Sequence, residues 1–216
     1  EGRATLLQSL GTHLISHKNI FPNARVSDLI DHLLKINPKE ISAVNVLKTV
    51  LKNLGAIWPG RITMDGVNLG DVWEYPPLKT KIAFHKLSQW LTYSLLTPLM
   101  DAGIKVTEVN LLTGLPEYRN GGLFLDFGVL SLKDTSLMST EHLANSELVV
   151  EWRALTVCLL DQVGALVQQK INKSPAEFPL AKVLEGGTWW AGRKIAAKLR
   201  SDGGPPLKLK SDGTVF

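Results

Sequence analysis

The sequence contains only one cysteine, Cys158, in 216 residues. A disulfide framework is therefore impossible, and a cysteine-rich zinc site is not expected. The sequence also lacks any run of 18 apolar residues, so we expect no membrane-spanning helix and no membrane partner. The formal net charge is only +4, from 24 basic and 20 acidic residues. Because these charges are interspersed, the sequence predicts no nucleic-acid partner.

Local signatures of catalysis are equally scarce. There is no G-x-S-x-G elbow, no H-E-x-x-H zinc motif, no Walker loop and no G-x-G-x-x-G turn. His13 and His17 have a spacing that suits a metal, but two half-exposed helix histidines are the simpler interpretation. We therefore expect neither a metal nor a cofactor. The chain starts at Glu1 without a signal-peptide pattern, which favours a cytoplasmic protein and a chain that is trimmed or part of a longer one.

What the chain does contain is the composition of a globular protein, with 44% hydrophobic and 20% charged residues. We interpret residues 1–216 as a single helical domain. Apolar residues recur with helical spacing in six segments, among them 3–17, 41–54 and 149–167. Cys158 lies in the last of these, and we expect it to be buried and inert.

A break in this helical pattern covers residues 56–79. Turn-forming pairs such as Asp65-Gly66 separate short apolar pieces. These features predict a small β-hairpin near 61–74, and we expect strand to be confined mainly to it. Pro76-Pro77 then predicts an extended link before a long helix from about residue 81 to 102.

The first candidate stretch lies inside that long helix. Lys86, Gln89, Trp90 and Tyr93 stand at i, i+3, i+4 and i+7, so they share one helix face. A face that combines a cation, an amide and two aromatic rings suits the wall of a ligand pocket. The alternative is a partly exposed helix on which Lys86 extends its ammonium group to solvent.

A second candidate stretch surrounds Glu117. Pro116 suits the first position of a helix, and Glu117 and Asn120 would then lie near the positive end of its dipole. Gly121 and Gly122 early in a helix cost roughly 1 kcal/mol each relative to alanine. Such a cost points to the close approach of a ligand or of another backbone. The alternative is a tight corner between two helices.

Two further stretches combine charge with aromatic rings. One contains Glu147, Glu151 and Arg153, and the other contains Gly186-Gly187-Thr188, Trp189 and Arg193. The second is typical of a loop that opens a helix and binds an anion through free backbone N–H groups. The alternative is a glycine hinge beside core tryptophans.

These stretches resemble the uracil catabolism protein 4 family, once catalogued as a domain of unknown function. The resemblance covers the whole chain and is carried by 58–61, 84–90, 115–122, 151–155, 184–189 and the terminal 211–216. Family members are considerably longer, so the resemblance implies that this chain corresponds to their C-terminal half, with its own N-terminal half as a candidate partner. It also implies a role in the pathway that degrades uracil through a ribosylated intermediate to urea.

A shorter resemblance connects the chain to the queuosine-nucleotide N-glycosylases of the DNA-glycosylase-like superfamily. It is carried by Phe84, Lys86 and Gln89, then Glu117, Tyr118 and Arg119, then Glu147 or Glu151 with Arg153-Ala154. The acid in those enzymes is usually Asp, whereas here it is Glu117, with a longer reach. The resemblance implies a mainly α, DNA-glycosylase-like helical domain.

Together the resemblances imply hydrolysis of an N-ribosyl bond, with ribosylurea or its phosphate as a small-molecule substrate. Glu117 would stabilise the sugar cation and activate water, with Asp126 as a second candidate. Lys86 would bind the substrate or assist the departing nitrogen, and we expect it to lower the pKa of Glu117. The expected substrate-binding residues are Gln89, Trp90, Tyr118, Arg119, Arg153, Trp189 and Arg193. The alternative is a non-catalytic helical scaffold of the same pathway.

Overall fold

The computed structural model describes residues 2–35, 38–59 and 61–210. The motif at 211–216 that carries part of the family resemblance lies outside these residues. More than half of the residues are helical, which confirms the predicted mainly α class. Within the described part of the chain, no helix is long and apolar enough to cross a membrane.

The chain folds into two compact units. The first contains residues up to Val72 together with 87–112, and the second contains 73–86 together with 113–210. Each unit is described by itself below. The expectation of one domain over 1–216 stays a prediction.

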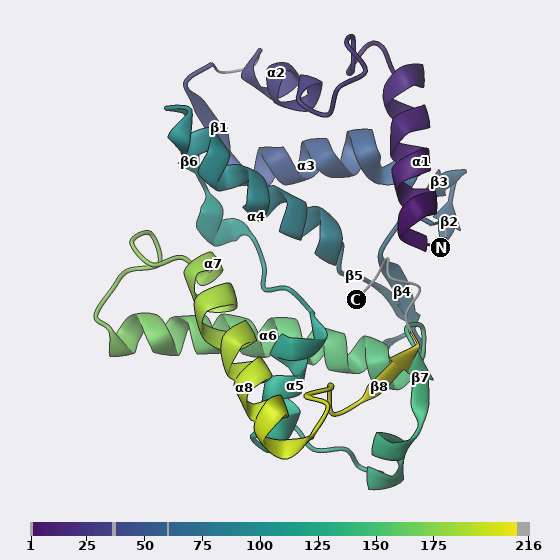
Figure 1. Ribbon diagram of the computed structural model, residues 1–216, viewed down its shortest axis with the longest axis vertical. Helices are drawn as coiled ribbons and strands as arrows, with labels where there is room; N and C mark the ends of the chain where they lie inside the picture. Colours follow the sequence, from purple (N-terminus) through teal and green to yellow (C-terminus); the bar gives the residue numbers. More distant parts are fainter. Residues whose placement is uncertain (1, 36–37, 60, 211–216) are drawn as a thin grey trace. The chain divides into compact units, whose positions relative to one another are not determined.

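Four helices of the first unit enclose an apolar core (Figure 1). They are α1 (Gly2–Ser16), α2 (Asp28–Leu34), α3 (Ala43–Leu54) and the part of α4 (Lys86–Asp101) that follows Lys86, with 3-10 turns η1 (Gly55–Ile57) and η3 (Val109–Leu111). On α3, Val46, Val50 and Leu54 are buried at a spacing of four residues, as the periodicity predicts. Ser42 begins this helix by accepting a hydrogen bond from the Asn45 N–H.

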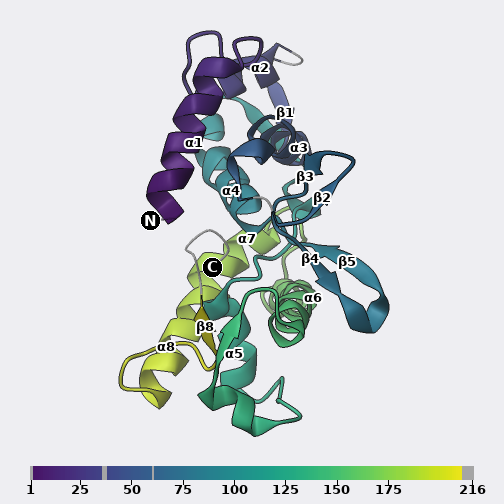
Figure 2. The ribbon, with the colours of Figure 1, turned by 90° about the vertical axis from the view of Figure 1, so that its right-hand side faces the viewer.

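Two hairpin-like pairs of strands follow in the segment where one was expected (Figure 2). The pair β2 (Thr63–Met64) and β3 (Val67–Asn68) is antiparallel and confirms the predicted hairpin. A second pair, β4 (Val72–Tyr75) and β5 (Thr80–Ala83), is joined by the 3-10 turn η2 (Pro76–Leu78). The predicted extended link at Pro76-Pro77 is therefore wrong.

The expected start of the long helix at Lys81 is also wrong, because Thr80–Ala83 pairs with β4 and helix α4 begins only at Lys86. Strand is not confined to 61–74 either. Parallel pairs join β1 (Glu40–Ser42) to β6 (Lys105–Thr107) and β7 (Glu141–Leu143) to β8 (Lys208–Lys210). Strands of three residues are too short to show a period of two, and their partners lie far away in the sequence.

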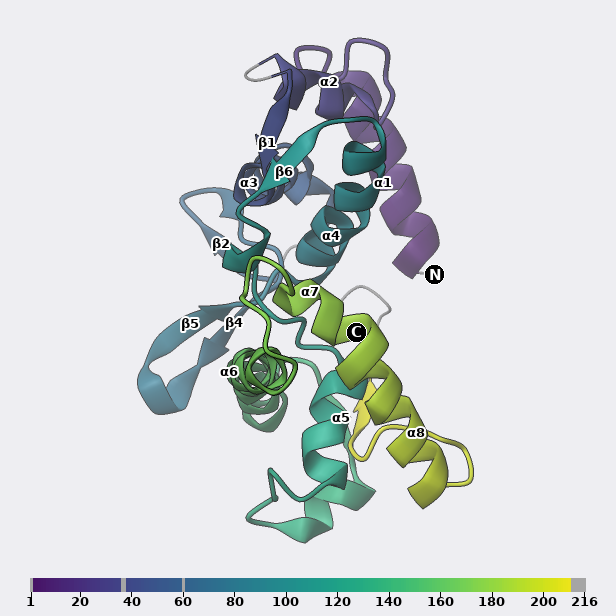
Figure 3. The same cartoon turned by 90° about the vertical axis from the view of Figure 1, so that its left-hand side faces the viewer.

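The second unit is built around α6 and the pair α5 and α8 (Figure 3). Its elements are α5 (Tyr118–Asp126), the 3-10 turn η4 (Thr135–Ser139), α6 (Glu147–Lys170), α7 (Leu180–Val183), the π-helical turn η5 (Leu184–Trp189) and α8 (Trp190–Leu199), with β7 and β8. The β4–β5 hairpin lies beside α6 (Figures 2 and 3). Close packing of α5 on α8 depends on Gly192, where an added Cβ would lie 2.2 Å from the carbonyl oxygen of Arg119.

The prediction that Cys158 is buried is wrong. Helix α6 buries a stripe that includes Trp152, Thr156 and Leu160, at a spacing of four residues. Cys158 lies two residues after Thr156, which is about 200° around the helix, and its side chain is exposed. An amphipathic helix with an apolar exposed side therefore produced a misleading burial signal.

Candidate functional site

The candidate site is centred on Glu117, the N-cap residue of helix α5. Its backbone is extended, and its side chain accepts hydrogen bonds from the N–H groups of Arg119 at 2.8 Å and Asn120 at 3.4 Å. Oε2 accepts both bonds, and neither involves Oε1. The carboxyl group therefore has a fixed orientation, in addition to a favourable position at the positive end of the helix dipole. Pro116, expected as the first helical residue, instead lies just before the cap.

Burial dominates the electrostatics of this carboxyl group. Only 9% of Glu117 is exposed, and this burial raises the pKa of Glu117 above its ordinary value. The hydrogen bond from Arg119 N–H and the positive charge of Lys86 lower the same pKa, but by less. The expectation of a net lowered pKa is therefore wrong, because loss of solvation outweighs the nearby cation.

Lys86 lies in the same unit and provides that nearby cation. It is the first residue of α4 and only 1% exposed, which is rare for a lysine. His85, immediately before it, has a left-handed backbone with φ of 49°. A backbone in this region costs about 1–3 kcal/mol, which the packing around the buried Lys86 must offset.

A second buried cation, Arg153, belongs to the same unit. It is 1% exposed, and its guanidinium lies 4.0 Å from the centre of the Phe84 ring. A cation over an aromatic face is stabilised by the ring quadrupole. The structure therefore places Phe84, Lys86, Glu117 and Arg153 in one unit, and it buries all four side chains.

Helix α5 is connected to the glycine-rich stretch by a buried hydrogen bond. The hydroxyl of Thr188 donates to Asn120 Oδ1 at 2.8 Å, and the Asn120 side-chain amide donates to the Leu115 carbonyl at 3.3 Å. Asn120 is the residue whose backbone N–H reaches Glu117. Thr188 therefore supports the turn that holds the candidate carboxylate.

The stretch around Thr188 does not open a helix, as had been expected. Leu180 begins a continuous helical segment that passes through the π-helical turn η5 and ends at Leu199. Gly186 and Gly187 lie inside this segment, so their N–H groups do not form a helix N-terminus for an anion. Single π-helical turns are common at functional sites, and this one presents Thr188 to Asn120.

The remaining predicted binding residues are divided between the two units. Gln89, which is buried, and Trp90, which is 54% exposed, belong to the first unit, while the others belong to the second. The guanidinium of Arg119 lies 4.9 Å from the centre of the Tyr118 ring. That of the exposed Arg193 lies 5.0 Å from the centre of the Trp189 ring. Both arginines are therefore positioned by aromatic faces, one on α5 and one on the turn η5.

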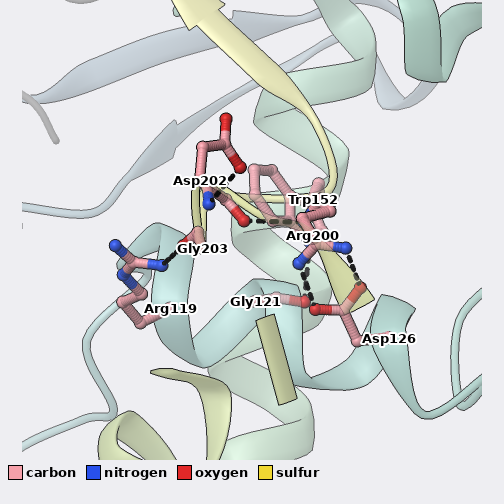
Figure 4. A network of polar contacts seen from close by, with 8 residues as sticks. Arg119, Gly121, Asp126, Trp152, Arg200, Asp202 and Gly203 are labelled. Carbon is pink, nitrogen blue, oxygen red and sulfur yellow. Dashed lines mark hydrogen bonds and ion pairs between the residues drawn. The ribbon is translucent and has the colours of Figure 1, made fainter. Parts of the chain in front are cut away.

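Asp126, the second candidate acid, is held in an ion pair. As the last residue of α5 it lies about 14 Å along the helix from Glu117. Its two oxygens accept hydrogen bonds of 2.7 and 2.6 Å from the Arg200 guanidinium (Figure 4). The pair joins residues 74 apart in the sequence, so no local signal could have identified Arg200.

The same arginine helps to hold the loop between α8 and β8. Arg200 Nε donates to the Gly204 carbonyl at 2.7 Å, and the Arg119 guanidinium donates to the Gly203 carbonyl (Figure 4). Trp152 Nε1 donates to the Gly121 carbonyl at 3.1 Å. An added Cβ at Gly121 would lie 2.8 Å from the Trp152 ring, so this glycine makes room for a side chain of α6, whereas a ligand or another backbone had been expected.

We expect Asp126→Asn to act on stability and not on chemistry. The Asp126 side chain is only 4% exposed, and its loss leaves Arg200, 26% exposed, without its charge partner. Breaking such a pair costs about 2–4 kcal/mol, at the lower end for a partly exposed partner. Chemical denaturation measures this, with Glu74→Gln as control, because the Lys81–Glu74 pair is exposed and contributes less than about 1 kcal/mol. Loss of turnover in a fully folded Asp126→Asn variant would instead show that Asp126 takes part in the reaction.

Comparison with known proteins agrees with the family resemblance. The protein family described as "Protein of unknown function (DUF1688)" matches residues 1–216. The chain is similar to "Protein urg3" of Schizosaccharomyces pombe, with 45% identity over 222 residues that cover 100% of this chain and 54% of that protein. It is also similar to "Uracil catabolism protein 4" of Lachancea kluyveri, with 40% identity over 251 residues, 100% of this chain and 56% of that protein. The chain thus spans somewhat more than half the length of these relatives.

Proposed function

The chain belongs to the family described as "Protein of unknown function (DUF1688)", and from this premise we propose that it acts in uracil degradation as an N-ribosyl hydrolase. The pathway is suggested by the relative named a uracil catabolism protein. The reaction is suggested by one observation, the buried Glu117 carboxyl group with a raised pKa beside the cationic Lys86. The proposed substrate is ribosylurea or its phosphate.

The proposed reaction adds water across the bond between C1′ of ribose and a urea nitrogen. As this bond breaks, its electron pair moves to the nitrogen and positive charge develops on the sugar. Glu117 stabilises that charge and accepts a proton from the attacking water, whose oxygen forms the new bond to C1′. A proton supplied to the nitrogen completes the release of urea, with Lys86 as its proposed donor. The products are ribose, or its phosphate, and urea.

The electrostatic state of Glu117 supports this role. A carboxyl group whose pKa is raised by burial is a stronger base than an exposed glutamate. Its orientation is fixed by two backbone N–H groups, so no reorganisation is needed when charge develops on the sugar. The proposed DNA-glycosylase-like character of the fold rests on the motifs around Lys86 and Glu117.

Urea release from ribosylurea and from its phosphate tests the proposed function directly. The assay uses the protein in its longest native form, alongside isothermal titration with both molecules. We expect binding and catalytic urea release with at least one of them. A helical scaffold would neither bind these molecules nor release urea, and that result would overturn the proposal.

The pH dependence of kcat/KM provides a separate prediction. Because burial raises the pKa of Glu117, the free enzyme should lose activity on acidification at a pH above 4.5, the ordinary glutamate value. The measurement is a pH profile between 4 and 9. A profile that stays flat down to pH 4.5 would contradict a requirement for ionised Glu117.

Replacement of Lys86 by Met should change both the rate and this profile. Met preserves the length of the buried side chain and removes its charge, and we expect kcat/KM to fall about 10²-fold, as for loss of a general acid. Lys86 lowers the pKa of Glu117, so the acidic limb of the profile should also move to higher pH. Lys81→Met, at an exposed lysine of β5, is the control and should leave both unchanged. If Lys86 had only a structural role, its replacement would change the stability of the fold and leave the acidic limb of the pH profile at its wild-type pH.

A further inference from the structure

A pocket lies in the second unit, away from the N-cap of α5. It has a volume of about 300 Å³ and is formed by the first turns of α6, by Leu125 of α5 and by the segment 130–137. That volume holds about ten water molecules and is at the lower end of the range for small-ligand sites. It is too small for a helix or a strand of another protein.

The walls of this pocket are mainly apolar and partly rigid. They include Leu125, Leu130, Leu132, Leu137, Leu148, Trp152 and Leu155. Trp152 is 4% exposed, and its indole N–H donates to the Gly121 carbonyl, so this ring has a fixed orientation. The pocket therefore offers a preformed apolar surface for one flat or branched hydrocarbon group.

Its charged groups are unbalanced. Three carboxylates line the pocket, Asp134, Glu147 and Glu151, against one ammonium group, Lys133. Asp134 accepts hydrogen bonds from the N–H and the hydroxyl of Ser136. Glu147 and Glu151 are exposed, and among the described residues neither is part of an ion pair with a lysine or arginine. Two like charges one helical turn apart repel each other, and a cation between them would remove the repulsion.

Tyr75 of β4 adds a hydrogen bond to this arrangement. Its side chain forms a hydrogen bond with Glu151, and burial together with the charges of Glu151 and Glu147 raises the pKa of Tyr75. The phenol therefore stays protonated and donates to the carboxylate. This bond orients Glu151 while leaving its negative charge in place.

We propose that this pocket binds a small organic cation, with a protonated amine or guanidinium group between Glu147 and Glu151 and an apolar body against Trp152 and the leucines. The site is separate from Glu117 and does not depend on the proposed hydrolase function. Charge complementarity identifies the ligand class, and the volume limits it to a small molecule.

Three probes of one shape and different charge test the proposal by isothermal titration. They are 2-phenylethylammonium, 2-phenylethanol and 3-phenylpropanoate. The cation should bind at least tenfold more tightly than the neutral probe, and the anion should bind most weakly. Glu151→Gln should weaken binding of the cation about tenfold and leave the neutral probe unaffected, and Glu147→Gln provides a second variant with the same expectation.

Two controls make the result specific. Asp161→Asn removes an exposed carboxylate from the same helix outside the pocket and should not change binding. Glu117→Gln should not change it either, which separates this site from the proposed catalytic one. Equal binding of the cation and the alcohol, no binding of any probe, or unchanged affinity in both glutamate variants would overturn the proposal.

Discussion

Glu117→Gln is expected to lower kcat for urea release by about 10²–10³-fold while KM changes little. The substitution keeps the volume of the side chain and its capping acceptor but removes the negative charge. The loss is of the size seen when one electrostatic stabiliser of a transition state is removed. KM is spared because the interaction strengthens only as charge develops on the sugar.

The same substitution should not destabilise the fold at neutral pH. A raised pKa means that the folded state binds the Glu117 proton more tightly than the unfolded state does. Stability from this group is therefore present at low pH and is lost as pH rises through the raised pKa. Gln resembles the protonated acid, so the variant should be at least as stable as the wild type at pH 7.

The combination of lower turnover and preserved stability distinguishes catalysis from a structural role. Kinetics and thermal unfolding are measured on the same preparation, with Glu141→Gln, at an exposed glutamate of β7, as control. Wild-type kcat in folded Glu117→Gln would remove Glu117 from the mechanism. Clear destabilisation at pH 7 would show that the carboxylate serves mainly to hold α5.

Gly192→Ala is expected to destabilise the protein by about 3 kcal/mol, the upper range for an overpacked contact. The added Cβ would lie 2.2 Å from the Arg119 carbonyl oxygen, a backbone atom that cannot rotate away. Helices α5 and α8 must separate to relieve the clash. For a chain of this size the change corresponds to a fall in Tm of about 6–12 °C.

Gly186→Ala is the matched control, because it makes the same substitution in the same helical segment. An added Cβ at Gly186 meets nothing within 4 Å, so the helix preference of alanine should raise stability by up to about 1 kcal/mol. Differential scanning calorimetry of the two variants should therefore show shifts of opposite sign. A Gly192→Ala protein as stable as the wild type would contradict the close packing of α5 on α8.

The separation of α5 and α8 in Gly192→Ala should also change the geometry of the candidate site. Arg119 lies two residues after Glu117, and its N–H donates to the carboxylate. Any displacement of this turn changes the orientation of Oε2. We therefore expect Gly192→Ala to lose turnover even at temperatures where it remains folded.

The sequence by itself determined the helical class, the antiparallel hairpin and the position of the candidate acid. These features depend on local chemistry: helical periodicity in α3 and α6, the turn at Asp65-Gly66, and an acid where a helix begins. The start of α5 was also predicted approximately from local chemistry. Because Pro116 suits the first position of a helix, the predicted start came too early in the sequence.

Only the tertiary structure decided which charges are buried and which groups meet. Burial reversed the expected direction of the Glu117 pKa, because desolvation depends on packing from all sides and not on neighbours in sequence. Asp126 pairs with Arg200, which is 74 residues away in the sequence, and Thr188 donates a hydrogen bond to Asn120, which is 68 residues away. The strand Lys105–Thr107 pairs with Glu40–Ser42. Side chains with no sequence period reach such partners only when the chain folds, so no local pattern specifies them.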